Sequence, residues 1–283
     1  MALIECVANV SEGRRREVLS ACEAAVVSAG ARLLDVHADG AHNRSVFTFA
    51  GTPDAIERAA VALFEPALAA IDLRTHTGVH PRIGAVDVVP FVPLDGATMA
   101  DCVAIARRVG AAVAARYHLP VFLYEDAAST PERTPLEHIR RGQFEGLAEK
   151  LTRPEWRPDF GPAVPHPSAG ATAVGARRLL VAFNVNLATD RLDVARAVAR
   201  AVRQSSGGLP FVKALGLSLT DRGIVTAEAA RHGVHVLESE IIGLVPASAL
   251  TDEAARAFKV AGWSDQLVLE NRLRATEDQA WRT

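Results

Sequence analysis

The order of strand-like and helix-like patterns in the first hundred residues constrains the fold most. "LIECVANVS" alternates like a strand, and "SEGRRREVLSACEAAVVSAG" then carries apolar residues at helical spacing. Two β-rich runs, "ARLLDVHAD" and "RSVFTFAG", flank the polar "GAHN", which predicts a hairpin. The helix "PDAIERAAVALFEPALAAI" and the strand "IGAVDVVPFVPL" follow. This β-α-β-β-α-β order predicts a ferredoxin-like unit, with helices on one face of an antiparallel sheet.

A proline-rich segment separates this unit from the rest of the chain. "RPEWRPDFGPAVPHPSAG" holds five of the fifteen prolines, so neither a helix nor a sheet runs through it. Before it, a third helix over residues 97–116 and the strand "PVFLYED" extend the first unit. After it, "RRLLVAFNVNL", "DRLDVARAVARAVRQS" and "LPFVKALGLSL" predict strand, helix and strand. A short helix, "TAEAARHGV", and a strand, "HVLESEIIGLVP", then close a second unit that lacks one strand.

These patterns predict an α/β (α+β) protein of two ferredoxin-like β-α-β-β-α-β subdomains, the second one shortened. We expect the first subdomain to cover residues 1–165 and the second to cover residues 166–283. A chain of 283 residues with 49% hydrophobic residues is long enough for two packed cores.

Composition excludes several classes of partner and compartment. A formal charge of -2 gives no overall attraction to nucleic acid or an anionic membrane. The three cysteines, Cys6, Cys22 and Cys102, match neither a disulfide framework nor a metal motif, so we expect buried thiols in a reducing compartment. The N-terminal apolar run precedes its basic cluster, the reverse of a secretory signal, and no run reaches about 18 apolar residues. We therefore expect a cytoplasmic protein.

Polar side chains concentrate where the predicted strands of the first unit end, which is where binding sites are often built. No P-loop and no Gly-x-Gly-x-x-Gly motif opens a helix, so nucleotide binding is not indicated. One interpretation of the cluster is a zinc or iron site, because imidazole and carboxylate groups suit these metals. Its ligands would come from His37, His42, His76, His80, Asp35 and Asp39. The residues around them argue against a helix that would bring His76 and His80 together, namely Thr75, Thr77, Gly78, Val79 and Pro81.

A second interpretation makes His80 a general acid or base, since histidine ordinarily titrates near neutral pH. Gly78 and Pro81 constrain the backbone around it, and Arg82 is placed to hold an anionic group beside it. The plain alternative is that His80 is a solvated turn residue, Arg82 is a surface charge, and Asp87 only hydrogen-bonds in a turn.

Several long segments resemble the formiminotransferase domain family, and they are spaced as in that family over nearly the whole chain. They are "ECVANVSEGRRREV", "LLDVHADGAHNRSVFTFAG", "HTGVHPRIGAVDVVPFVPL", "PVFLYEDAA", "PDFGP" and "GATAVGARRLLVAFNVNL". The resemblance implies transfer of a formimidoyl group from N-formimidoyl-L-glutamate to N5 of tetrahydrofolate, a step of histidine degradation that feeds one-carbon metabolism. It also implies two α/β subdomains with folate in a groove between them, and no metal is expected. The shortened second unit would leave a strand edge unpaired, which predicts pairing with a second chain in a homodimer, and the family's tendency to oligomerise supports this. Nothing after Thr283 corresponds to a cyclodeaminase domain, so we expect a stand-alone transferase.

The resemblance places the family's catalytic histidine on His80 and its folate-binding stretch on the second half of the proline-rich segment. That stretch consists of Gly161, Pro162, Ala163, Val164, Pro165, His166, Pro167, Ser168, Ala169 and Gly170. Some family members carry an acidic residue where this chain has His37. The usual strand and most of a following helix are missing between Gly223 and Ile224.

Further substrate contacts are inferred from residue chemistry. Arg82, or alternatively Lys213 or Arg44, would pair with a carboxylate of the donor or of the folate tail. Hydrogen bonds to the pterin or the amidine are expected from Asn9, Asn184 and Asn186, with His37 also near the substrate. Two other functions remain open at this point. One is a folate-binding relative without transferase activity, and the other is a transferase that uses 5-formyl-tetrahydrofolate.

Overall fold

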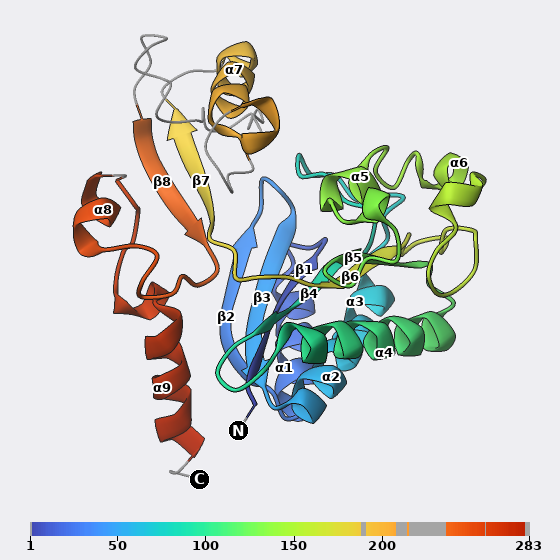
Figure 1. Cartoon of the computed structure of the whole chain (residues 1–283), viewed down its shortest axis with the longest axis horizontal. Helices are drawn as coiled ribbons and strands as arrows, with labels where there is room; N and C mark the ends of the chain where they lie inside the picture. Colours follow the sequence, from blue (N-terminus) through green and yellow to red (C-terminus); the bar gives the residue numbers. More distant parts are fainter. Residues whose placement is uncertain (1, 188–190, 208–213, 215–235, 258, 281–283) are drawn as a thin grey trace. The chain divides into compact units, whose positions relative to one another are not determined.

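The chain folds into two compact units, Met1–Leu179 and Leu180–Thr283. The computed structural model (Figure 1) describes all residues except 1, 188–190, 208–213, 215–235, 258 and 281–283. The described part of each unit has a sheet of its own, with six strands in unit 1 and two in unit 2.

Unit 1 is a mixed sheet with helices. Its strands are β1 (Ile4–Val10), β2 (Arg32–Asp39), β3 (Arg44–Gly51), β4 (Val86–Pro93), β5 (Val121–Glu125) and β6 (Thr172–Ala176). Its α-helices are α1 (Arg16–Ser28), α2 (Pro53–Ala62), α3 (Phe64–Ala70), α4 (Met99–Tyr117), α5 (Leu136–Arg140) and α6 (Leu147–Leu151). The strand order across the sheet is β2-β3-β1-β4-β6-β5.

The first four strands have the predicted connectivity. β1 lies between β3 and β4 and is antiparallel to both, and β2 pairs antiparallel with the outer side of β3. The expected second helix is broken into α2 and α3 after Leu63. Pro66 explains the break, because it has no N–H to donate to the carbonyl of Ala62 and its ring crowds that carbonyl. The helix predicted over 97–116 is α4, which begins with a capping box made by Thr98 and Asp101.

Unit 1 continues beyond the boundary that the prolines predict. β6 follows the proline-rich segment and inserts between β4 and β5, parallel to both. The sequence pattern predicts no strand here and a second subdomain that begins at residue 166. Strand β6 is short and built from small residues, and Gly175 is needed because a Cβ there would lie 2.4 Å from the Tyr124 ring. Its pairing with two distant strands keeps residues 166–179 in unit 1.

Two apolar clusters cover the two faces of this sheet. α1, α2, α3 and α4 pack on one face (Figure 1), and their apolar residues join Phe47, Phe49 and Phe91 in the larger cluster. On the other face, α5 and α6 cover the part of the sheet formed by β4, β6 and β5. Phe122 and Tyr124 pack there against Ile139, Leu147 and Leu151.

Unit 2 is described in part. β7 (Ala182–Leu187) pairs antiparallel with β8 (Val236–Ile242), as two of the predicted strands. The helices described here are α7 (Leu192–Val202), α8 (Asp252–Ala257) and α9 (Leu269–Ala280). The predicted strand "LPFVKALGLSL", apart from Ala214, and the junction between Gly223 and Ile224 lie outside the described residues. The two-subdomain ferredoxin-like arrangement therefore stays a prediction for this half.

The three cysteines are free and buried, as predicted. Among the described residues, no helix combines the length and apolar character that a membrane crossing requires.

Candidate active site

The face of the sheet away from α1–α4 carries polar side chains on β1 and β3. Cys6 and Ala8 of β1 belong to the larger apolar cluster, so Glu5 and Asn9 point to the opposite face. Asn9 accepts a hydrogen bond there from the Arg44 guanidinium, at the start of β3. Burial, with the charge of Arg140 nearby, lowers the pKa of Arg44 to about 10. Arg44 Nε is buried and has no hydrogen-bond partner among the described residues.

The β2–β3 turn is fixed by its own side chains. The Asp39 carboxylate accepts hydrogen bonds from the backbone N–H groups of Ala41 (2.7 Å) and His42 (2.9 Å). It also accepts from His42 Nδ1 at 2.7 Å. These hydrogen bonds hold the pKa of Asp39 well below its ordinary value, and the bond from the His42 ring has the largest effect. Asn43, with φ at 47°, binds the neighbouring loops through its side chain to Gly13 N (3.1 Å) and Thr77 O (3.0 Å).

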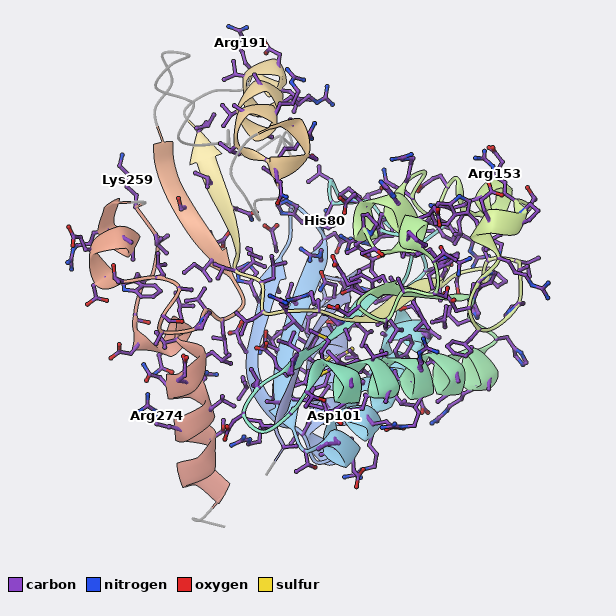
Figure 2. The ribbon with its side chains drawn as sticks, viewed as in Figure 1. His80, Asp101, Arg153, Arg191, Lys259 and Arg274 are labelled. Atoms are coloured by element: carbon purple, nitrogen blue, oxygen red, sulfur yellow. The ribbon has the colours of Figure 1, made fainter. Side chains whose placement is uncertain are left out.

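His80 lies beside this turn (Figure 2), with its ring centroid 6.0 Å from that of His42 in an edge-on arrangement. His80 Nδ1 lies 2.8 Å from the carbonyl oxygen of Pro81, which only accepts, so Nδ1 carries the proton and Nε2 carries the lone pair. The pKa of His80 falls to about 2, mainly through burial and then through the charges of Arg44 and Arg140. The free protein therefore holds His80 as a neutral imidazole.

The loop that follows His80 is held by Asp87 and Ser11. Asp87 Oδ1 accepts from the backbone N–H groups of Ile83 (2.7 Å) and Gly84 (3.2 Å). Its other carboxylate oxygen pairs with Arg140, at 3.0 Å from Nε and 2.5 Å from an NH2 group. Ser11 donates its hydroxyl to the carbonyl of Gly84 at 2.6 Å. The turn hydrogen bonds considered for Asp87 are thus present, together with an ion pair to Arg140 on α5.

Arg82 binds protein groups. Its guanidinium pairs with Glu145 at 2.7 and 3.0 Å and also donates to Gln143 and to His76 Nδ1. His76 Nε2 in turn binds the carbonyl of Asn43 at 2.9 Å. Arg82 is only 8% exposed, so among the described groups its charge is used to hold the loop before α6.

The end of the predicted folate-binding stretch lies against the loop after His80. Gly84 forms a β-bridge with Gly170, and Ala85 N donates to the carbonyl of Ala169 at 3.0 Å. His166 pairs with Gly170 through two backbone hydrogen bonds, and its Nδ1 accepts from Ala169 N at 3.0 Å. Residues 166–170 thus form a tight turn against the loop that follows His80, whereas Val164, in the same stretch, is 62% exposed.

The other predicted contacts divide between the two units. His37 lies on β2, opposite Val46 of β3 and on the same sheet face as Arg44. Asn184 lies on β7 of unit 2, opposite Glu240. The side chain of Asn186 and all of Lys213 lie outside the described residues.

The histidines of the first unit do not gather into a ligand set within the described part of the chain, where no three His, Cys, Asp or Glu side chains are placed to hold a metal ion. His42 binds Asp39, His76 binds Arg82, and His80 binds Pro81.

Three members of the site were not predicted from the sequence as catalytic or binding groups. His42 and Asp39 were considered only as metal ligands, and Arg140 was not singled out. Nothing in "LEHIRRG" distinguishes Arg140 from Arg141, because its partner Asp87 lies 53 residues away along the chain.

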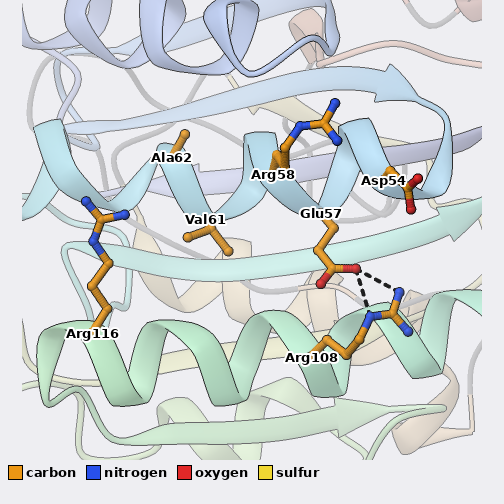
Figure 3. A pocket seen from close by; sticks show the side chains of 7 residues that line it. All are labelled: Asp54, Glu57, Arg58, Val61, Ala62, Arg108 and Arg116. Carbon is orange, nitrogen blue, oxygen red and sulfur yellow. Dashed lines mark hydrogen bonds and ion pairs between the residues drawn. The ribbon is translucent and has the colours of Figure 1, made fainter.

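A separate groove of about 670 Å³ lies between α2 and α4 on the helical layer (Figure 3). Charged residues dominate its lining, and Arg108 pairs there with Glu57 at 2.7 Å. None of the predicted site residues lines it.

Comparison with known proteins gives consistent matches. The family described as "Formiminotransferase domain, N-terminal subdomain" matches residues 3–177, nearly all of unit 1. The chain is 43% identical to glutamate formimidoyltransferase of Streptococcus pyogenes serotype M1 and 40% identical to that of Thermoplasma acidophilum. Both alignments cover 96% of this chain and 98% of the relative. It is also 40% identical to formimidoyltransferase-cyclodeaminase of Rattus norvegicus, over 89% of this chain and 52% of that protein.

Proposed function

Because this chain belongs to the formiminotransferase family, we propose that it is a glutamate formimidoyltransferase. It moves the formimidoyl group of N-formimidoyl-L-glutamate to N5 of tetrahydrofolate, in histidine degradation and one-carbon metabolism. The observation that carries this function is the 43% identity to a glutamate formimidoyltransferase over nearly the full length of both chains.

In this proposal His80 accepts the proton that N5 loses as it attacks the amidine carbon. Two features support the role. Nδ1 donates to the carbonyl of Pro81, so the lone pair of Nε2 is available. The neutral form of the ring also prevails, because burial and two arginines disfavour the imidazolium. An anionic donor near these arginines would offset their charge and make His80 a stronger base.

Arg44 is the better candidate for the donor carboxylate. Its buried Nε has no hydrogen-bond partner in the part of the chain that the structure describes, while the guanidinium of Arg82 is occupied by Glu145. We propose that residues 161–170 form the folate wall, supported by the contact of Gly170 with Gly84 in the loop after His80. Asn9 would bind the pterin or the amidine, and His37, Asn184, Asn186 and Lys213 complete the proposed contacts.

The test is turnover of purified protein with N-formimidoyl-glutamate and tetrahydrofolate. We expect both to be consumed, and His80→Ala to lower kcat about a hundredfold or more, the usual contribution of a general base. The matched control is His138→Gln on α5, whose ring binds the carbonyl of Glu132. Circular dichroism of each variant checks that it is folded. Near-normal turnover of folded His80→Ala would contradict the role of His80.

The same assay separates the alternatives. Formyl transfer from 5-formyl-tetrahydrofolate, without use of N-formimidoyl-glutamate, would identify a different donor. Binding of tetrahydrofolate with no turnover of either donor would identify a folate-binding protein. Tetrahydrofolate acts in this proposal as the acceptor substrate, with no resident metal. We also propose that the protein is cytoplasmic, on the basis of its cysteine usage and N-terminal pattern, and that it is a homodimer, on the basis of the strand edge expected to be unpaired in the second unit.

A further inference from the structure

A second histidine, which the proposed function does not use, lies beside His80. His42 is 7% exposed, and its ring contacts that of His80 edge-on, with 6.0 Å between the ring centroids. The carboxylate of Asp39 accepts from His42 Nδ1 at 2.7 Å. A carboxylate in this position fixes the tautomer of a histidine and stabilises its imidazolium, as in catalytic triads.

The surrounding chain holds this pair in place from three sides. Asp39 also binds the backbone of residues 41 and 42, which locks the turn. Two glycines let neighbouring loops approach it closely. A Cβ on Gly13 would lie 2.2 Å from the carbonyl oxygen of Asp39, and one on Gly78 would lie 2.2 Å from that of His42. These close approaches hold the backbone of the turn, and the hydrogen bond to Asp39 holds the His42 ring.

The two rings have opposite electrostatic surroundings. Arg44 and Arg140 act on His80, and both disfavour a proton there. Arg140 is itself paired with Asp87, whereas His42 is paired with the carboxylate of Asp39. A carboxylate thus contacts the His42 ring, whereas two guanidinium groups disfavour a proton on His80, which leaves neutral His80 as the proton acceptor.

Resting on the proposed function, we propose that His42, supported by Asp39, is a second catalytic residue that protonates the departing glutamate nitrogen. N5 of tetrahydrofolate forms a bond to the amidine carbon, and its proton passes to Nε2 of His80. The bond from that carbon to the glutamate nitrogen then breaks, the electron pair stays on nitrogen, and His42 Nε2 supplies the proton. Transfer of the proton from His80 to His42 restores the starting state, so protons and electrons balance.

The test compares two donors whose leaving nitrogens differ in basicity and therefore in how much their departure depends on an acid. His42→Gln is assayed with N-formimidoyl-glutamate and with its 4,4-difluoro analogue, which keeps both carboxylates but has a less basic nitrogen. With the natural donor we expect kcat to fall about a hundredfold, with KM changed less than about threefold. With the difluoro donor we expect the loss to shrink to about tenfold or less, because a better leaving group depends less on an acid.

Asp39→Asn is the second variant, with His138→Gln again as the control. We expect a smaller loss of kcat with the natural donor, and again a reduced loss with the difluoro donor. If His42→Gln fails to fold, Asp39→Asn provides the comparison in its place. An equal loss of kcat with both donors would show a structural role and overturn the proposal, as would full activity of folded His42→Gln. If the unaltered protein turns over neither donor, the proposed function fails and the role of His42 fails with it. If the unaltered protein is active and His42→Gln loses the same factor of kcat with both donors, only the role of His42 is refuted.

Discussion

At the scale of single residues, Glu5 shows how burial changes a side chain's chemistry. It lies on β1, only 3% exposed, on the sheet face away from the main helices. Burial raises its pKa from 4.5 to about 7, although the charge of Arg177 acts in the opposite direction. Between pH 4.5 and 7 the folded protein holds a proton that the unfolded chain loses. Stability from this group is therefore complete below about pH 4.5 and is lost as the pH rises through 7.

We predict that Glu5→Gln removes this dependence, because glutamine stays neutral at every pH. Relative to the unaltered protein, the variant should gain on the order of 3 kcal/mol in unfolding free energy at pH 8 and little at pH 4.5. Urea unfolding at the two pH values measures the difference. If the substitution changes the unfolding free energy equally at both pH values, Glu5 titrates normally in the folded protein and the prediction is wrong.

At the scale of elements, α5 needs support from outside itself. It has only five residues, too few for an isolated helix to be stable. Lys150 of α6 supplies that support, with Nζ donating to the carbonyls of His138 (2.7 Å), Ile139 (2.6 Å) and Arg141 (3.1 Å). Its ammonium also lies 4.0 Å from the centre of the Trp156 ring. Lys150 thereby holds the helix that carries Arg140 to Asp87.

We predict that Lys150→Met, which keeps the apolar stem, lowers the unfolding free energy by about 2 kcal/mol, since buried carbonyls lose their donor. Amide hydrogen exchange in residues 136–141 should accelerate, and kcat should fall severalfold as Arg140 loosens. Arg153→Met is the matched control, because its partner Glu149 is on the surface, and an effect below about 0.5 kcal/mol is expected. Similar effects of the two substitutions would refute the support role of Lys150.

At the scale of the whole molecule, the first unit is complete only with β6. That strand hydrogen-bonds to β4 on one side and β5 on the other, so its removal leaves both edges unpaired. The two apolar clusters also take part of their buried residues from residues 169–176.

We predict that a fragment of residues 1–179 folds by itself and unfolds cooperatively on heating, because it contains the whole sheet and both clusters. A fragment ending at residue 165, the boundary expected from the prolines, should show no cooperative transition and should aggregate. Calorimetry and light scattering on both fragments provide the comparison. Equal behaviour of the two would mean that β6 is dispensable.

Local pattern by itself determined the order of elements from β1 to β5. Apolar periodicity and capping residues act over a few positions, so "LIECVANVS" and Thr98 carry their own structural signal. His80 was a candidate from its own chemistry and its Gly-Pro setting, the family resemblance assigned it the catalytic role, and the turn "GAHN" was predicted from its composition. Residues 215–235, in the middle of the predicted second unit, lie outside the described part of the chain.

Only the tertiary structure decided the place of β6 and which charged groups contact one another. Strand β6 is short and built from small residues, and its place depends on two strands that precede it by many residues. The pairing of Asp87 with Arg140, the engagement of Arg82 by Glu145 and the contact of His42 with His80 all join distant segments. The neutral state of His80 follows from burial and from Arg44 and Arg140, which local sequence does not specify. Desolvation and ion pairing depend on what the folded chain brings together in space, and therefore they had to be taken from the structure.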